Sequence, residues 1–248
     1  DKKANILISP QYDEIIIPNP EKGIFVCYQE NNTKILNENG EEILTQYDNV
    51  QPIRLKNITS DLMYEKSVLR YENEGKKITK PVYDEIDSLP YKEGELIVRE
   101  NEKYGVINIK GNKIIEISYD KIVTDEYYTD ENRYQYAGYI VSIKTPEGYR
   151  YGYINHQGKE LLNTEYNDIS RVTEMKHDTN PYLIYAKNGQ YGIAKNGEKI
   201  LENEYQSIRY DMSNQVFVVE KSKKYGIANL DGKIIVPLQY HQIDITGI

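Results

Sequence analysis

Tryptophan is absent from this 248-residue chain, and phenylalanine occurs only twice. Tyrosine, with 25 residues, must therefore supply most of the aromatic burial, and its buried hydroxyls need hydrogen-bond partners. The single cysteine, Cys27, excludes an intrachain disulfide and any zinc site built from cysteines. One thiol is compatible with the cytosol and with bacterial export, so it does not decide the compartment.

Long apolar runs are also lacking, since no stretch approaches the roughly 18 residues of a membrane span. Lysine and arginine (31) are outnumbered by aspartate and glutamate (39), which gives a net charge of −8. A surface of that sign repels phosphate backbones, so we expect no nucleic-acid partner. The chain begins at Asp1 rather than Met, from which we expect a removed N-terminal segment; a signal peptide and an expression boundary explain this equally.

What the sequence does have is an internal repeat. The stretch KYGVINIKGNKIIEISYDKI (103–122) returns as RYGYINHQGKELLNTEYNDI (150–169) and KYGIANLDGKIIVPLQYHQI (224–243). Seven tyrosines are each followed three residues later by an aliphatic residue: Tyr12, Tyr47, Tyr83, Tyr119, Tyr166, Tyr205 and Tyr240. Their spacing is mostly near 36 residues, which predicts a tandem array in which each unit buries the apolar face of its neighbour.

The pattern inside each unit predicts strands and tight turns. In residues 94–101, Leu96 and Val98 stand two positions apart and are expected to face inward, as in a half-buried strand. Asn108 and Gly111 occupy the first and last positions of a type I turn, in which Asn bonds its own backbone and Gly takes a left-handed conformation. The shorter Asn196-Gly197 predicts a two-residue hairpin.

The Tyr–x–x–aliphatic element predicts a bend, because positions i and i+3 of a strand point to opposite faces. We expect the bend to bring both side chains to one side. Aspartate follows the tyrosine at Asp13, Asp48, Asp84 and Asp120, and we expect its carboxylate to cap this local turn. Because Asn167, Gln206 and His241 fill the same position, the aspartate is structural rather than catalytic.

The repeated residues resemble the WG-repeat (KWG) family of bacterial proteins, with Tyr-Gly in place of Trp-Gly. The pairs are Tyr104-Gly105, Tyr151-Gly152, Tyr191-Gly192 and Tyr225-Gly226, each followed by an Asn- or Gly-containing turn and the Tyr–x–x–Ile close. The resemblance spans most of the chain and is clearest over 76–123 and 149–245. It implies an all-β repeat scaffold, often exported, with no shared enzymatic activity.

We therefore predict an all-β fold of tandem β-meander repeats of about 36 residues in an open curved or superhelical array. A six-bladed β-propeller is the alternative, although both ends of the chain carry the same Tyr–x–x–Ile element and so duplicate each other. The prediction is a single array over 1–248 with units near 12–46, 47–82, 83–118, 119–165 with an insertion, 166–204 and 205–239, and a cap over 240–248.

Function, on this reasoning, belongs to the insertion between 119 and 166, where tyrosines accumulate in what we expect to be a loop. An exposed tyrosine cluster would stack on sugar rings or anchor a protein partner; the alternative is that the rings pack on the scaffold. The candidate residues are Tyr127, Tyr128, Tyr134, Tyr136, Tyr139 and Tyr149.

No arrangement typical of a cofactor, metal or catalytic site is found. The acidic residues Asp125, Glu126, Asp130 and Glu131 lack the order of a calcium loop and are interpreted as a solvated charged loop. His156, His177 and His241 occupy unrelated settings. We expect a non-catalytic scaffold that binds an unidentified protein or glycan, exported or at the cell surface of a bacterium, with a cytoplasmic location as the alternative. The competing functional hypothesis is an enzyme with its site in a propeller channel.

Overall fold

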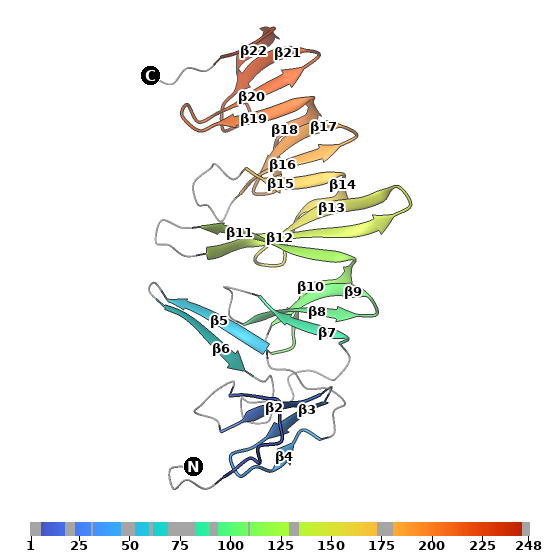
Figure 1. Ribbon diagram of the computed structural model, residues 1–248. Helices are drawn as coiled ribbons and strands as arrows, with labels where there is room; N and C mark the ends of the chain where they lie inside the picture. The colour runs from blue at the N-terminus through green and yellow to red at the C-terminus, as the bar shows by residue number, and fades with distance from the viewer. Residues whose placement is uncertain are drawn as a thin grey trace. The chain divides into compact units, whose positions relative to one another are not determined.

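The computed structural model describes residues 6–17, 23–30, 32–45, 53–59, 62–68, 83–89, 94–108, 110–128, 134–172 and 181–244, and in these ranges every regular element is a β-strand (Figure 1). The described residues include no helix that could cross a membrane. The chain divides into two compact units, Asp1–Lys113 (unit 1) and Ile114–Ile248 (unit 2), and each is described by itself.

Five separate four-stranded sheets and one hairpin contain the described strands, and no sheet closes on itself. Each sheet is a meander, with strands paired in chain order. The first two sheets are β1 (Glu14–Ile16), β2 (Phe25–Gln29), β3 (Asn32–Leu36), β4 (Glu42–Ile43), and β7 (Glu85–Ser88), β8 (Glu95–Glu100), β9 (Lys103–Asn108), β10 (Lys113–Tyr119). The hairpin is β5 (Ile53–Thr59) and β6 (Leu62–Val68). The third sheet is β11 (Lys121–Tyr128), β12 (Tyr134–Thr145), β13 (Gly148–Asn155) and β14 (Glu160–Tyr166). The last two are β15 (Asp168–Arg171), β16 (Tyr182–Lys187), β17 (Gln190–Lys195), β18 (Glu198–Tyr205), and β19 (Ser207–Asp211), β20 (Val216–Lys221), β21 (Lys224–Ala228), β22 (Ile234–Tyr240). The predicted all-β fold of tandem meanders is confirmed.

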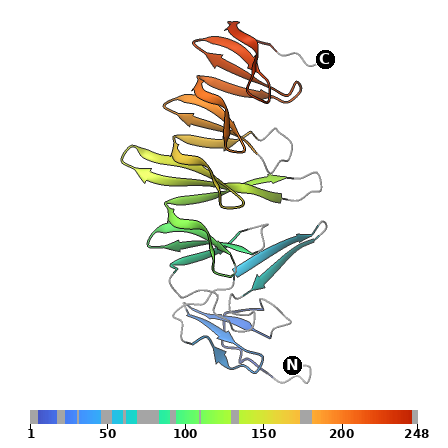
Figure 2. The ribbon, with the colours of Figure 1, turned by 180° about the vertical axis from the view of Figure 1, so that it is seen from behind.

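In unit 2 the last three sheets follow one another in a row, with β15–β18 between the other two (Figures 1 and 2). The last two strands of each sheet contact the first two strands of the next: β13 lies against β15, β14 against β16, β17 against β19, and β18 against β20. Each sheet therefore packs on its neighbour in sequence, which is the arrangement of a tandem array.

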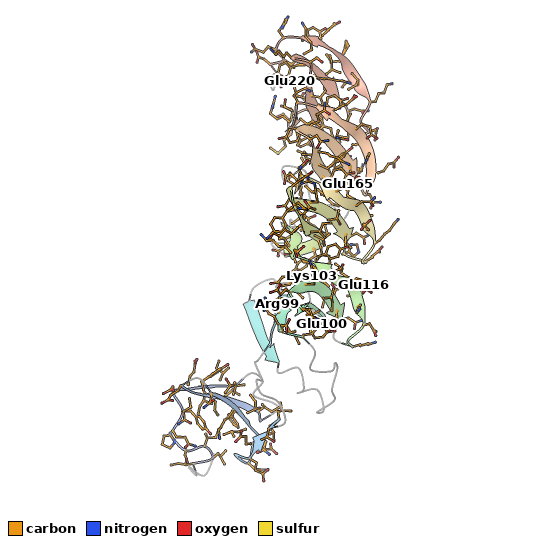
Figure 3. All side chains as sticks on the ribbon, turned by 90° about the vertical axis from the view of Figure 1, so that its right-hand side faces the viewer. Arg99, Glu100, Lys103, Glu116, Glu165 and Glu220 are labelled. Carbon is orange, nitrogen blue, oxygen red and sulfur yellow. The ribbon has the colours of Figure 1, made fainter. Side chains whose placement is uncertain are left out.

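The apolar cores of unit 2 lie between successive sheets. One cluster joins Tyr153, Leu162 and Tyr166 to Ile169, Leu183, Tyr185 and Ala194 of the next sheet. The closing Tyr166 and Ile169 thus meet in one core, as the bend predicted, and the Tyr166 and Tyr185 rings pack edge to face with centroids 4.9 Å apart. Around this core, Glu165, labelled in Figure 3, pairs with Lys187 of the next sheet at 2.7 Å.

In the three sheets β11–β14, β15–β18 and β19–β22, the Tyr-Gly pair is explained by a bulge in the last strand. Tyr191 of β17 faces Tyr205 of β18, whereas Ile193 faces Leu201, so β18 carries extra residues opposite Gly192. A Cβ at Gly192 would lie 2.6 Å from the Leu201 carbonyl oxygen and 2.5 Å from the Tyr185 ring. The same close approach of the fourth strand occurs at Gly152 and Gly226. Glycine is required because the bulged backbone crosses directly over it.

The turns between third and fourth strands form as predicted. The Gly111 amide donates to the Asn108 carbonyl at 2.8 Å, and the Asn108 side-chain oxygen accepts from the amides of Lys110 and Asn112, both at 2.9 Å. Gly111 has φ of 82°. The same bonds recur at Asn37, Asn155 and Asn229. Asn196 and Gly197 both have positive φ, as a two-residue hairpin of this kind requires.

At Asp84, Asn167 and Gln206, the residue after the closing tyrosine bonds a turn further along the chain instead of its own bend, which corrects the expectation for Asp84; Asp48 lies outside the described residues. The Asp84 carboxylate accepts from the amide of Asn101, seventeen residues on, in the turn between β8 and β9. Gln206 reaches the Ser222 amide at 2.7 Å and Asn167 reaches the Asn188 amide at 2.8 Å. Asn101, Asn188 and Ser222 all have positive φ without being glycine. The side chain therefore stabilises a turn whose backbone conformation is otherwise unfavourable for L-residues.

Candidate functional site

The insertion is built from long strands rather than a loop, which corrects the expected conformation. β11 and β12 pair from Lys121↔Ser142 to Tyr128↔Tyr134, with a bulge between Asp125 and Glu126. β12 continues to Thr145 and pairs with β13 as far as Gly148. The extra residues thus lengthen two hairpins of the sheet β11–β14 (Figures 1 and 2).

The six candidate tyrosines occupy different environments. Tyr139 is fully buried and Tyr136 is 7% exposed, so neither presents its ring to a partner. Tyr127 is half-buried beneath the Arg171 guanidinium, whose carbon lies 5.2 Å from the ring centroid. Tyr128 and Tyr134 are register partners, and their side chains lie outside the described part of the structure.

Tyr149 is half-buried on β13, and the Lys121 ammonium lies 4.5 Å from its ring centroid. Val123 is two residues from Lys121 on β11, so the two side chains lie on the same face of the strand. Val123 is 57% exposed. We name the surface formed by Lys121, Val123 and Tyr149 the β11 surface. Tyr127 lies six residues from Lys121, about 20 Å along the strand, so Tyr127 and Tyr149 do not belong to one cluster.

A buried polar cluster lies beside this surface. The Asp125 carboxylate accepts from Arg171 Nε at 2.8 Å and from Arg171 Nη2 at 2.9 Å, while the Tyr153 hydroxyl donates to it at 2.5 Å. Asp125 and Arg171 side chains are only 5% and 10% exposed. Asp125 is therefore not part of a solvated loop as expected from the sequence; its charge is paired in the interior, between the sheets that begin with β11 and β15.

Burial and the neighbouring Asp125 carboxylate shift the pKa values of Tyr153 and Arg171. Burial, reinforced by the Asp125 charge, raises the pKa of the Tyr153 hydroxyl above its usual value. Burial lowers the pKa of Arg171, but the hydrogen bonds and charge of Asp125 outweigh this and leave the pKa raised. Tyr153 thus stays protonated as a donor and Arg171 stays charged, so the cluster holds two sheets together as a fixed ion pair.

The remaining acidic and histidine candidates are dispersed. Glu126 accepts from the Thr124 hydroxyl at 2.6 Å, and Asp130, Glu131 and His177 lie outside the described residues. His156 lies in the turn before β14, and His241 Nε2 contacts Lys224 Nζ at 2.8 Å. Across the described ranges, no three His, Cys, Asp or Glu side chains are grouped so that they could hold a metal ion.

Sequence reasoning missed Arg171, Lys121 and Val123. Arg171 lies 46 residues from Asp125 in the sequence. Because this pair does not recur in the other units, the repeat pattern does not indicate that the two residues interact. Lys121 and Val123 follow the closing Tyr119, as the first-strand residues of every unit follow a closing tyrosine, so their position in the repeat does not single them out. Their side chains are exposed in the structure, and the repeat pattern does not indicate this.

These features define a tandem β-repeat protein. The family model for the WG containing repeat matches the chain in four places: residues 72–104, 104–127, 151–174 and 225–245. The chain is thus similar to WG-repeat proteins over those ranges. No curated protein matches the sequence.

One solved structure, described as the crystal structure of the eukaryotic initiation factor, is similar at 11% identity. The match covers 92% of this chain and 67% of that chain, with a TM-score of 0.37. A likeness at this level carries no conclusion about fold or function.

Proposed function

We propose that the protein is a non-catalytic scaffold of the WG-repeat type, from a bacterium, exported or attached to the cell surface, that binds a protein or glycan partner. The match to the WG containing repeat supports the repeat-scaffold part of this proposal. Location and partner rest on the family resemblance and on the surface described next.

The observation that carries the proposal is how the repeated polar residues are used. The turn asparagines bond their own backbone, and Asp84, Asn167 and Gln206 bond the next hairpin turn. Repetition therefore serves the architecture. We infer that binding comes from what is not repeated, and among the described residues the lengthened sheet β11–β14 is one such feature.

The β11 surface fits a partner protein better than a glycan. Val123 is an exposed aliphatic side chain two residues from Lys121, whose ammonium group lies over the Tyr149 ring. Apolar and aromatic groups with a charged rim are typical of protein contact sites. β11 is also an edge strand, which leaves its outer backbone groups available to a partner strand.

Point substitutions test this surface better than a deletion, because removing residues 124–150 would remove the buried Tyr139 and Val141. The double variant Val123→Ser/Tyr149→Ala is compared with wild type in a pull-down and on a glycan array. Met212→Ser, an exposed residue in a different repeat, is the control. We expect the double variant to lose binding by about tenfold or more, with the control unchanged. Undiminished binding would exclude the surface, and cleavage of a captured partner would contradict the non-catalytic assignment.

A further inference from the structure

One row of side chains recurs in each four-stranded sheet. The row begins two residues after a closing tyrosine, on the first strand, and continues through the register partners on the second and third strands. Register partners lie on the same face of a sheet, so the three side chains of a row are neighbours. The rows are Glu14–Tyr28–Thr33, Glu85–Arg99–Tyr104, Lys121–Ser142–Tyr151, Asp168–Ala186–Tyr191 and Ser207–Glu220–Tyr225.

Four of these rows contain one carboxylate: Glu14, Glu85, Asp168 and Glu220. Arg99 Nε lies 3.3 Å from the Glu85 carboxylate, and the Ser207 hydroxyl donates to the Glu220 carboxylate at 2.9 Å. Arg99 and Glu220 are labelled in Figure 3. The charge of Glu220, with burial and a hydrogen bond to the same carboxylate, raises the pKa of the Tyr225 hydroxyl. In these two rows the carboxylate is the acceptor for the neighbouring polar side chains.

The row of the sheet β11–β14 has no carboxylate. Lys121 takes the position that an acidic residue has on three of the other first strands, and its row neighbours are Ser142 and Tyr151. The row therefore consists of an ammonium group and two hydroxyls, all of which can donate to an anion. Among the described residues, Lys121 forms no ion pair, and its one contact of this kind is with the Tyr149 ring.

Ser142 lies in the middle of this row with its hydroxyl unused. Its side chain is 2% exposed, and the hydroxyl has no hydrogen-bond partner in the described part of the chain. A buried hydroxyl without a partner is destabilising, and folded proteins contain few of them. Such a group in the interior of a row of donors indicates an acceptor that comes from outside the chain.

The Lys121 side chain lies over β12, on the face that carries Ser142. Lys121 on β11 and Tyr149 on β13 are on opposite sides of β12, and the ammonium lies 4.5 Å from the ring centroid. Lys121 is exposed, and a cation–π contact at an exposed site is weaker than a charge-assisted hydrogen bond to a carboxylate. A carboxylate above Ser142 would therefore draw the ammonium away from the Tyr149 ring.

We propose that Lys121, Ser142 and Tyr151 bind an aspartate or glutamate side chain of a partner protein. This carboxylate completes the row as Glu220 completes the row of the last sheet. The partner is a protein because aspartate and glutamate side chains complete the other four rows, and because the exposed Val123 offers an aliphatic contact next to Lys121. The inference rests on the proposed function, since Lys121 belongs to the β11 surface.

A chemical-shift titration of the whole isotope-labelled chain tests the site with a defined probe. The probe is N-acetyl-glutamate N-methylamide, and its neutral match is N-acetyl-glutamine N-methylamide. We expect the charged probe to shift the backbone amide signals of Ser142 and Tyr151 with a Kd in the millimolar range, and the neutral compound to shift neither. No shift with the charged probe, or equal shifts with both compounds, would overturn the proposal. Tighter binding of glucuronate, a sugar carboxylate, would overturn the choice of a protein partner.

Variants separate binding from folding. Lys121→Glu introduces the acidic residue of the other first strands, and Ser142→Ala removes the hydroxyl, so each should weaken probe binding by about tenfold or more. Ser142→Ala should keep or raise the urea midpoint of unfolding, because it removes a buried polar group without a partner. Lys159→Glu, an exposed position in the turn before β14, makes the same change of charge and should bind as wild type. Wild-type affinity in Ser142→Ala or Lys121→Glu would contradict the site.

The titration and the partner pull-down can fail independently. If Val123→Ser/Tyr149→Ala loses the partner while the charged probe does not bind, the β11 surface remains the binding site and only the carboxylate site is wrong. Undiminished partner binding in the double variant would exclude the β11 surface, and with it the partner's carboxylate, even if the probe bound.

Discussion

At the scale of single residues, the glycine of each Tyr-Gly pair has a steric reason that the sequence only suggests. Gly192 has no room for a side chain, because the Leu201 carbonyl and the buried Tyr185 ring occupy the position of its Cβ. The tyrosines in turn replace tryptophan and phenylalanine in the core: Tyr139, Tyr153 and Tyr185 are among the largest fully buried side chains.

Gly192→Ala should lower the free energy of unfolding by about 1–3 kcal/mol, because the added methyl group overpacks a buried bulge. The measurement is urea-induced unfolding followed by circular dichroism. Gln190→Ala, on the same strand, should change the value by less than about 0.5 kcal/mol. Equal losses of unfolding free energy at the two positions would show that the bulged part of β18 moves to make room for the added methyl group.

Arg171→Met should cost about 3–5 kcal/mol in unfolding free energy, because it leaves the Asp125 carboxylate buried without its cation. Lys187→Met breaks the exposed pair with Glu165 and should cost less than about 1 kcal/mol. Thermal and urea unfolding of both variants provide the comparison. A small loss at Arg171 would mean that water reaches Asp125.

At the scale of elements, the turn between β20 and β21, the first two hairpin strands after β19, has residues with positive φ, and a side chain distant in sequence accepts a hydrogen bond from its backbone. Ser222 and Lys223 have φ of 53° and 60°, and the Gln206 side chain accepts from the Ser222 amide. The backbone amide of Gln206 also donates to the Glu220 carbonyl at 2.8 Å. One residue thereby fixes the start of a sheet to its first reversal, which sets the register of both strands.

Gln206→Ala should destabilise the protein by about 1 kcal/mol through the lost turn hydrogen bond. Hydrogen exchange should report faster exchange at the Ser222 amide, while amides in the sheet β11–β14 keep their protection. Gln242→Ala, at an exposed position beyond β22, is the matched control and should leave the exchange at Ser222 unchanged. If the Ser222 amide exchanged at the same rate in Gln206→Ala as in wild type, the hydrogen bond from Ser222 to Gln206 would be contradicted.

At the scale of the whole molecule, an open array and a closed ring predict different dimensions. A compact globule of 248 residues has a radius of gyration of about 18 Å. A clearly larger value from small-angle scattering of the dilute protein, with an asymmetric distance distribution, would favour the open array. A value near that of a globule would favour the propeller alternative.

The many buried tyrosines should make the whole protein sensitive to alkali. Burial raises the pKa of Tyr153 and Tyr185 in the folded state. In the unfolded chain a tyrosine ionises near pH 10. Above that pH the unfolded state releases protons that the folded state retains, so the unfolding free energy falls as the pH rises.

Urea unfolding at neutral and alkaline pH measures this dependence. Tyr153→Phe should reduce the slope of stability against pH above about pH 10, because it removes one such proton. An unchanged slope in the variant would show that Tyr153 ionises alike in both states.

The sequence by itself determined the repeat, the strand order within a unit and the turns, because glycine, asparagine and alternating apolar residues act through contacts a few residues apart. It also placed Tyr166 and Ile169 on one side of a bend. Only the tertiary structure decided that the insertion extends strands, that Tyr136 and Tyr139 are buried, and that Asp125 pairs with Arg171. Those outcomes depend on which residues distant in sequence meet across a sheet or between sheets, and a local pattern carries no information on such contacts.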